Sequence, residues 1–317
     1  MIFRLFLRDV FFVFSKKIFL RIFNSILQNG ATLKNWATSL LVPIHKKGSE
    51  DDPSNYRGIA LISCLAKLFY SILNNRLLKY CIEEKILSDT QLGFLPGNRT
   101  SDAHIILHNL IDKYCHKKKR ILYGCFVDFS KAFDNLPRYG LFEKLQKIGV
   151  TGKFYEILCS IYQDDVVRIK LGDKILPAIH TLIGVRQGCV LSPMLFNIFM
   201  SDLAGNLSSD VLVEIDTDKK INCMLWADDI VLLSETEDGL NKLLKDLHVY
   251  SQANDLKVNV DKTKCMIFNK TGRLIRRNFY LGDCKIENVR SYKYLGLVFT
   301  PIRRNQVRIR RFKIKST

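Results

Sequence analysis

Residues 221–234 read INCMLWADDIVLLS, in which two adjacent carboxylates interrupt an otherwise apolar run. The pattern predicts a strand, a tight turn at Ala227-Asp228-Asp229 and a second strand. Earlier in the chain, ILYGCFVDF at 121–129 is rich in strand formers, and Asp128 near its end is its only charge. This run predicts a buried central strand. Because burying an uncompensated carboxylate is costly, such groups are normally paired, protonated or bound to metal.

Carboxylates at the ends of two strands can support phosphoryl transfer. Mg²⁺ prefers oxygen ligands in octahedral geometry and commonly keeps waters and substrate phosphates in its shell. Two such ions held about 4 Å apart stabilise the attacking and leaving oxygens of an in-line displacement. An aspartate at a strand end beside a turn can equally be a structural residue paired with a lysine, so either site alone leaves both interpretations open.

Apolar residues at helical spacing predict two helices before the central strand. The first, within 59–86, would bury Leu61, Leu65, Leu68, Ile72 and Leu78. The second, at 101–115, would bury Ala103, Ile106, Leu107, Leu110 and Tyr114. A further helix is expected from about 237 to 254, with strands at 264–268 and 292–299. Elements that alternate in this way indicate a mixed α/β or α+β architecture.

The formal net charge of +18 suits a polyanionic partner, although a basic surface without a partner explains the charge as well. Nine cysteines, an odd number with no CxxC pair, disfavour a zinc site or a disulfide framework and fit a reducing compartment. The apolar N-terminal run is interrupted by Arg8 and Asp9 and is too short to span a bilayer. We therefore expect a soluble intracellular protein.

The sequence resembles the reverse transcriptase domain of non-LTR (LINE-type) retrotransposons collinearly over about 20–299. FVDFSKAFDNL (126–136) and LWADDIVLL (225–233) are similar to the family's two catalytic motifs, and GVRQGCVLSPMLFNIF (184–199) is similar to its template- and nucleotide-contacting motif. DLKVNVDKTKCMIF (255–268) and YKYLG (292–296) resemble the two motifs that follow. WATSLLVPIHKKGSEDDPSNYRGIALIS (36–63) and QLGFLPGNRTSDA (91–103) resemble fingers segments.

The resemblance implies an α+β right-hand polymerase fold, with an antiparallel palm sheet backed by helices. It implies an N-terminal apolar and basic segment at 1–19, fingers at 20–120 and a palm at 121–300 with interleaved fingers elements. The basic tail at 301–317 is expected to be disordered. Relative to the family's full polyprotein, the chain looks truncated at both ends, without an endonuclease domain and with the thumb largely missing.

The resemblance also implies roles for individual residues of the catalytic centre. Asp128, Asp228 and Asp229 would be catalytic metal ligands, and the main-chain carbonyl of Phe129 would be a further oxygen ligand. Lys262 would protonate the departing pyrophosphate, although a plain surface lysine is an equal alternative.

Other residues would contact the incoming nucleotide. Arg57 would clamp its triphosphate, because a planar guanidinium matches phosphate oxygens bidentately. Phe133 would crowd the 2′-OH, or else be an ordinary core residue. Gln187 would contact the template–nucleotide pair, and Gly188 would let the backbone approach it closely. A second cation would come from Lys46 or Lys47, between which the sequence does not choose.

The predicted function is that of an RNA-directed DNA polymerase. It would add dNTPs to a DNA primer 3′-OH on an RNA template with two Mg²⁺ ions, for which Mn²⁺ could substitute. No membrane partner is expected, and the family resemblance favours the nucleus. Two alternatives stay open: an inactive remnant with residual non-specific RNA binding, and a group II intron maturase or telomerase-like polymerase with the same chemistry. The sequence determines neither host nor oligomeric state.

Overall fold

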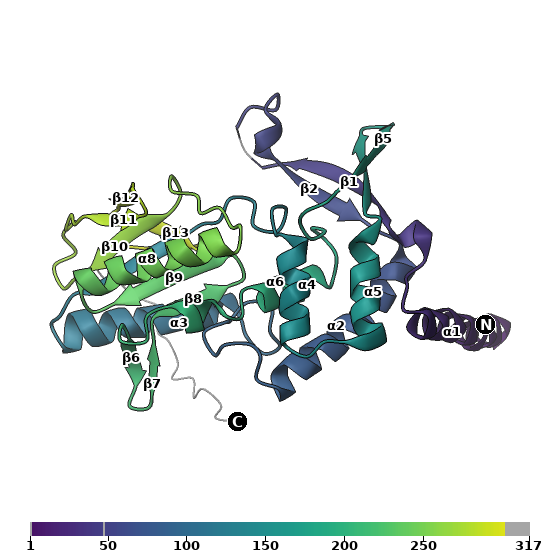
Figure 1. Ribbon diagram of the computed structural model, residues 1–317, viewed down its shortest axis with the longest axis horizontal. Coiled ribbons are helices and arrows are strands. Elements are labelled where there is room, and N and C mark those ends of the chain that lie inside the picture. Colours follow the sequence, from purple (N-terminus) through teal and green to yellow (C-terminus); the bar gives the residue numbers. More distant parts are fainter. Residues whose placement is uncertain (1, 47, 302–317) are drawn as a thin grey trace. The chain divides into compact units, whose positions relative to one another are not determined.

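The computed structural model describes residues 2–46 and 48–301, and these residues form two compact units (Figure 1). The first unit combines the chain up to Ile86 with Leu136–Phe199, and the second combines Leu87–Asn135 with the chain from Met200 onward. The chain thus passes between units after Ile86, Asn135 and Phe199. The tail expected from residue 301 lies outside the described residues from 302 onward.

The first unit contains a four-stranded sheet of order β2-β1-β4-β5 together with helices. Strand β1 pairs antiparallel with β2 and parallel with β4, and β4 forms a hairpin with β5. The elements of this unit are α1 (Ile2–Asn29), η1 (Lys34–Trp36), β1 (Thr38–His45), η2 (Pro53–Asn55), β2 (Tyr56–Leu61), α2 (Cys64–Glu83), α4 (Arg138–Lys147), α5 (Gly152–Gln163), β4 (Val166–Leu171), β5 (Lys174–His180) and α6 (Ser192–Phe199). Helix α1 includes most of the segment expected at 1–19 and continues to Asn29.

Helix α2 differs from the helix predicted within 59–86. It begins only at Cys64, because the preceding residues extend as β2. The predicted apolar face is also wrong, since Leu61, Leu68 and Ile72 are exposed. The face that packs consists of Ala66, Phe69, Tyr70, Leu73, Leu77 and Cys81. Apolar residues occur on more than one side of this helix, so periodicity alone did not identify the buried side.

The second unit is built on a six-stranded sheet of order β11-β12-β10-β3-β9-β8. Its elements are α3 (Thr100–Ile111), η3 (Asp112–Lys117), β3 (Leu122–Val127), α7 (Leu203–Asn206), β6 (Val213–Asp216), β7 (Lys219–Ile221), β8 (Cys223–Trp226), β9 (Asp229–Ser234), α8 (Glu237–Ala253), β10 (Lys264–Phe268), β11 (Phe279–Leu281), β12 (Cys284–Asn288), β13 (Tyr292–Tyr294) and β14 (Leu297–Phe299). The strands and the two helices predicted from these stretches are confirmed, and 292–299 is a hairpin of two short strands. The pairs are antiparallel except β10 with β12.

Strand β3 lies inside this sheet and is buried along its whole length. One set of its alternating residues, with Phe126 as a large member, packs on buried residues of α3 and of the β13–β14 hairpin. Helix α8 contacts β3, β9 and β11 and lies across the sheet in Figure 1. The strand that leads to Asp128 is therefore a rigid, two-sided core element.

Candidate active site

The two adjacent aspartates lie at the tip of the β8–β9 hairpin, which we call the carboxylate turn (residues 227–229). Trp226 pairs with Asp229 across the hairpin, and Ala227 has a φ of +53°. A left-handed φ is uncommon for a residue other than glycine and costs about 1 kcal/mol or more. The turn is therefore held in a strained conformation by its surroundings.

Strand β3 brings Asp128 beside this turn. Val127 pairs with Ile230 in the antiparallel register of β3 and β9, so the next residues along, Asp128 and Asp229, point to the same face of the sheet. Burial, together with the nearby carboxylates of Asp228 and Asp128, raises the pKa of Asp229 to about 6. Tertiary structure thus brings Asp128 close to two adjacent carboxylates that lie far from it in the sequence.

Asp128 is held by its backbone rather than by its carboxylate. Its N–H donates to Oγ1 of Thr263 at 3.2 Å, and its carbonyl accepts from the N–H of Asn259 at 2.7 Å. Among the described residues, Oδ2 of Asp128 is buried without a hydrogen-bond donor, and Nζ of Lys262 lies 3.7 Å from it. A buried carboxylate oxygen in this state is suited to binding a cation. Lys262, expected to act near pyrophosphate, is exposed and adjacent to this carboxylate.

The residues after Asp128 form a turn. Phe129 makes an isolated antiparallel bridge with Val258, whose hydrogen bonds use the carbonyl of Asp128 and the N–H of Ser130. The Phe129 carbonyl therefore takes no part in this bridge. Phe133 lies in the turn and is half-buried, and thus differs from the fully buried Phe126.

Tyr292, to which the sequence analysis gave no role at the site, is a neighbour of the carboxylates. Its ring stacks on Phe126, with 4.4 Å between centroids. Burial raises the pKa of Tyr292 to about 12, and the charges of Asp128 and Asp229 act in the same direction. The YKYLG segment therefore lies near the carboxylates. It is placed there because the β13–β14 hairpin packs on β3. The sequence signal for this segment was the YKYLG motif, which assigned Tyr292 no role of its own.

In the described part of the chain, no three His, Cys, Asp or Glu side chains meet in an arrangement that could hold a metal ion as they stand. The three carboxylates are close enough to repel one another, as the raised pKa of Asp229 indicates. Repulsion between like charges favours side-chain positions in which the carboxylates point away from one another. A cation bound between the carboxylates would offset this repulsion. Carboxylate oxygens are nonetheless the kind of ligand that Mg²⁺ prefers.

Arg57, Gln187 and Gly188 lie in the first unit. The N–H of Ala60 on β2 donates to the Gln187 carbonyl at 2.8 Å, so the strand that carries Arg57 is joined to the 184–188 segment. Gly188 has a φ of +99°, and a Cβ there would meet the Ala60 carbonyl oxygen at 3.1 Å. Glycine is therefore required by conformation and by close approach. Arg57 is exposed and Gln187 is half-buried.

The pair of lysines near Arg57 stays unresolved. Lys46 is exposed, and Lys47 lies outside the described residues.

A buried ionic cluster, which the sequence did not reveal, supports the 184–188 segment. Asp165 accepts hydrogen bonds from Arg138 (2.5 Å) on Oδ2 and from Arg186 (2.8 Å) on Oδ1. Arg186 also donates to the carbonyls of Trp36, Ala37 and Ile161, and Arg138 donates to those of Gly184, Tyr162 and Thr181. The sequence shows Arg186 beside Gln187, but nothing in it indicates that Asp165 is the partner.

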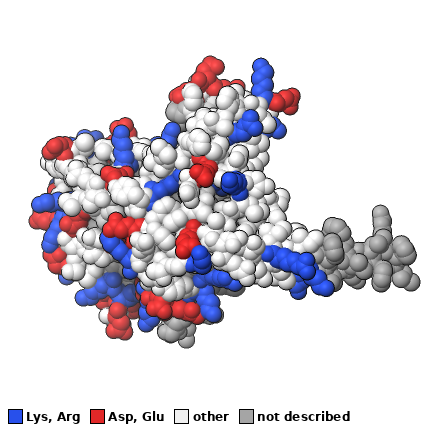
Figure 2. All heavy atoms as spheres, turned by 45° about the vertical axis from the view of Figure 1, so that its right-hand side comes forward, with Lys and Arg blue, Asp and Glu red and all other residues white. Residues whose placement is uncertain are grey.

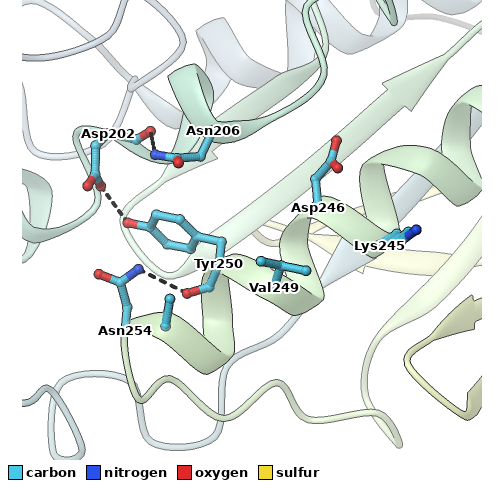
Figure 3. A pocket seen from close by; sticks show the side chains of 8 residues that line it. Asp202, Asn206, Lys245, Asp246, Val249, Tyr250 and Asn254 are labelled. Carbon is cyan, nitrogen blue, oxygen red and sulfur yellow. Dashed lines mark hydrogen bonds between the residues drawn. The ribbon is translucent and has the colours of Figure 1, made fainter.

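The distribution of surface charge and one surface cavity can be compared with the carboxylate turn. On the face shown in Figure 2, basic side chains are scattered among acidic ones. A surface cavity of about 240 Å³ beside α8 is lined by Tyr250, whose hydroxyl donates to Asp202 at 2.6 Å (Figure 3). None of the expected site residues lines this cavity. Among the described residues, no helix is long and apolar enough to cross a membrane.

Known families and proteins resemble the chain over most of its length. The model of the family "Reverse transcriptase (RNA-dependent DNA polymerase)" matches residues 44–299. A probable RNA-directed DNA polymerase from transposon BS of Drosophila melanogaster is 30% identical over 287 residues, which are 87% of this chain and 31% of that protein. A Pol polyprotein from the retrotransposable element R2DM of the same species is 30% identical over 89% of this chain and 27% of its own length. The chain thus spans about a third of these relatives.

Solved structures share the fold at low sequence identity. An apo telomerase from Candida tropicalis, truncated from its C-terminal domain, has a TM-score of 0.56 and 15% identity, and the match covers 85% of this chain and 54% of the telomerase chain. Identity at this level supports similarity of fold and nothing finer. The predicted right-hand polymerase fold, with helices and largely antiparallel sheets, is confirmed.

Proposed function

The chain belongs to the reverse transcriptase family, as a domain of the non-LTR retrotransposon type, and on this premise we propose that it performs two-metal, RNA-templated DNA synthesis. Its reaction would transfer a deoxynucleotide from a dNTP to the 3′-OH of a DNA primer paired with RNA. The observation that carries the proposal is the meeting of Asp128, Asp228 and Asp229, where Asp128 Oδ2 lacks a hydrogen-bond donor among the described residues and the pKa of Asp229 is raised to about 6.

Asp128, Asp228, Asp229 and the Phe129 carbonyl would hold two Mg²⁺ ions, or Mn²⁺ in their place. The bound ions would supply electrostatic stabilisation of the attacking and leaving oxygens. The protein's own contribution is a rigid frame, because Asp128 extends from a fully buried strand and its backbone is fixed by Thr263 and Asn259. Ordered ligands lose little freedom when a cation binds.

Lys262 would provide the proton for departing pyrophosphate. Its Nζ is exposed but lies 3.7 Å from Asp128 Oδ2, so it can reach a phosphate bound at the carboxylates. An ammonium group beside negative phosphate oxygens also offsets their charge.

In the first unit, Arg57 would bind the triphosphate, while Gln187 and Gly188 would contact the template–nucleotide pair. The hydrogen bond from Ala60 to Gln187 supports this, because it ties the two segments into one surface. Phe133 would limit space at the 2′-OH, and its half-buried position after Asp128 is compatible with contact to a substrate.

Primer extension by this chain on poly(rA)/oligo(dT) with Mg²⁺ tests the proposal. We expect template-dependent products that disappear in Asp128→Asn and Asp228→Asn variants, both of which keep the size of the side chain. Equal synthesis by the wild type and the variants would contradict the assignment of the carboxylates. Binding of RNA without synthesis in any variant, wild type included, would instead favour the inactive alternative.

A further inference from the structure

Residues 90–93 extend the second unit's sheet beyond its edge strand β8. The N–H of Leu225 donates to the Thr90 carbonyl at 2.9 Å, and the N–H of Leu92 donates to the Leu225 carbonyl at 2.8 Å. Gln91 and Leu225 thereby form a parallel bridge. The segment is thus fixed to the strand that carries the carboxylate turn, although it lies far from that strand in the sequence.

The side chain of Gln91 reaches the turn itself. Gln91 is 3% exposed, and its Oε1 accepts from the N–H of Ala227 at 3.3 Å and from the N–H of Gly93 at 2.9 Å. Ala227 is the residue with the left-handed φ of +53°. An acceptor placed at its N–H stabilises the strained conformation, because the buried donor would otherwise lack a partner.

The amide nitrogen of Gln91 shows what this arrangement costs. Nε2 is buried and has no hydrogen-bond partner among the described residues. Leaving such a group unsatisfied destabilises the fold, a penalty that an apolar side chain of similar size would avoid. Glutamine at this position therefore contributes through its Oε1, which accepts hydrogen bonds from the N–H groups of Gly93 and Ala227.

Gly93 touches the turn from the same side. A Cβ at residue 93 would lie 2.7 Å from the backbone nitrogen of Ala227 and 3.0 Å from the carbonyl carbon of Trp226. These are backbone atoms of the hairpin, so they cannot move aside as a flexible side chain could. Any larger residue at this position must displace either its own segment or the carboxylate turn.

We propose that Gln91 and Gly93 are positioning residues that set the backbone of the carboxylate turn and, through it, the places of Asp228 and Asp229. The inference rests on the proposed function of these aspartates. This proposal assigns residues 91–94 (QLGF) a positioning role within the second unit. The resemblance of 91–103 to a fingers motif does not imply that role. The segment acts on the turn through the backbone and contacts neither nucleotide nor metal.

The test compares two variants with two matched controls in the same unit. Gln91→Met removes the acceptor oxygen at nearly constant size, and Gly93→Ala inserts the clashing Cβ. Asn98→Ala removes a side-chain hydrogen bond to Leu92 that does not reach the turn, and Gly205→Ala adds a Cβ that meets nothing within 4 Å. Thermal melting identifies any variant that has lost its fold.

In primer extension, we expect kcat to fall about 100-fold in Gly93→Ala, since misplacement by about 1 Å can cost that much. For Gln91→Met we expect a loss of about tenfold, with a higher Mg²⁺ requirement and an unchanged KM for dNTP in both variants. Both controls should match the wild type. A raised KM with unchanged kcat would overturn the proposal, because it would mean that the segment contacts substrate.

Hydrogen exchange provides a readout that does not depend on synthesis. Amides of 223–229 should exchange faster in Gln91→Met than in the wild type and in Asn98→Ala. If the wild type is inactive, the proposed function fails while exchange still tests the positioning role. Unchanged exchange in Gln91→Met overturns that role regardless of activity.

Discussion

In the first unit Asp165 lies between two arginines, whereas in the second unit Asp128 lies beside two further carboxylates. Both Asp165 oxygens accept hydrogen bonds from arginine, and its side chain is 2% exposed. Asp128 has one buried oxygen without a hydrogen-bond donor among the described residues, and its side chain is 28% exposed. Asp128 is the only charge in an apolar run, whereas Asp165 directly follows the polar residues Gln163 and Asp164, so only Asp128 is conspicuous in the sequence.

The difference shows how a buried charge reveals its role. A compensated charge, such as Asp165, holds segments together, because its partners would be left buried and unpaired without it. Carboxylates that repel one another, such as Asp128 and Asp229, oppose folding and persist where a ligand of opposite charge benefits from them. The first kind should therefore respond to mutation in stability, and the second kind in activity.

The largest expected effect is on catalysis. Asp128→Asn or Asp228→Asn should lower primer-extension kcat by about 1,000-fold or more, because the loss of metal-borne charge stabilisation is worth several kcal/mol. The melting temperature should stay at or above that of the wild type, since like-charge repulsion is removed. A melting temperature well below that of the wild type would contradict the comparison by making Asp128 a structural residue.

A large effect on stability is expected when the buried ionic cluster around Asp165 is disrupted. Asp165→Ala should lower the free energy of unfolding by about 3–5 kcal/mol, because Arg138 and Arg186 would be left buried without their anion. Urea denaturation measures the change. Asp173→Ala is the matched control, because Asp173 is an exposed aspartate between β4 and β5. Equal stability of the two variants would show that Asp165 does not hold the first unit together.

Phe133 should produce a moderate effect on substrate choice. Phe133→Val should raise ribonucleotide incorporation roughly tenfold relative to deoxynucleotide incorporation, as expected when an apolar contact is shortened. Competing rNTP and dNTP in single-nucleotide extension measures the ratio. If the ratio is unchanged while the melting temperature falls, Phe133 is a packing residue like Phe126.

The smallest expected effect is on the pH dependence of stability. The pKa of Asp229 is about 6 in the folded chain against an ordinary 3.8, so the folded state holds this proton more tightly than the unfolded chain. The stabilisation from holding it is present below about pH 4 and is lost as the pH rises through about 6. Asparagine at residue 229 does not titrate, so Asp229→Asn keeps its stability while the wild type loses this contribution. The variant should therefore become more stable than the wild type, relative to their difference at pH 4, as the pH rises through this window. Thermal melting in EDTA from pH 4 to 8 measures the difference, which would be constant if Asp229 lacked the shift.

Sequence alone determined the strands that carry the chemistry. The apolar run of β3 is followed by a carboxylate and that of β8–β9 is interrupted by two, and a short apolar run rich in strand-forming residues is a local property. For the same reason α8 and β10 were predicted near their observed bounds. The candidate carboxylates were found because a charge inside an apolar run is conspicuous without any knowledge of partners.

Tertiary structure decided what the local pattern left open. On α2 several apolar sides compete, and only packing selected the one that includes Phe69 and Leu73. The partners of Arg186, the return of Tyr292 to the carboxylates and the contact of Gln91 with Ala227 all join segments distant in sequence. The hydrogen-bond partners and the burial of a residue depend on which distant segments of the chain pack against it. Local residue spacing carries no information about those distant segments.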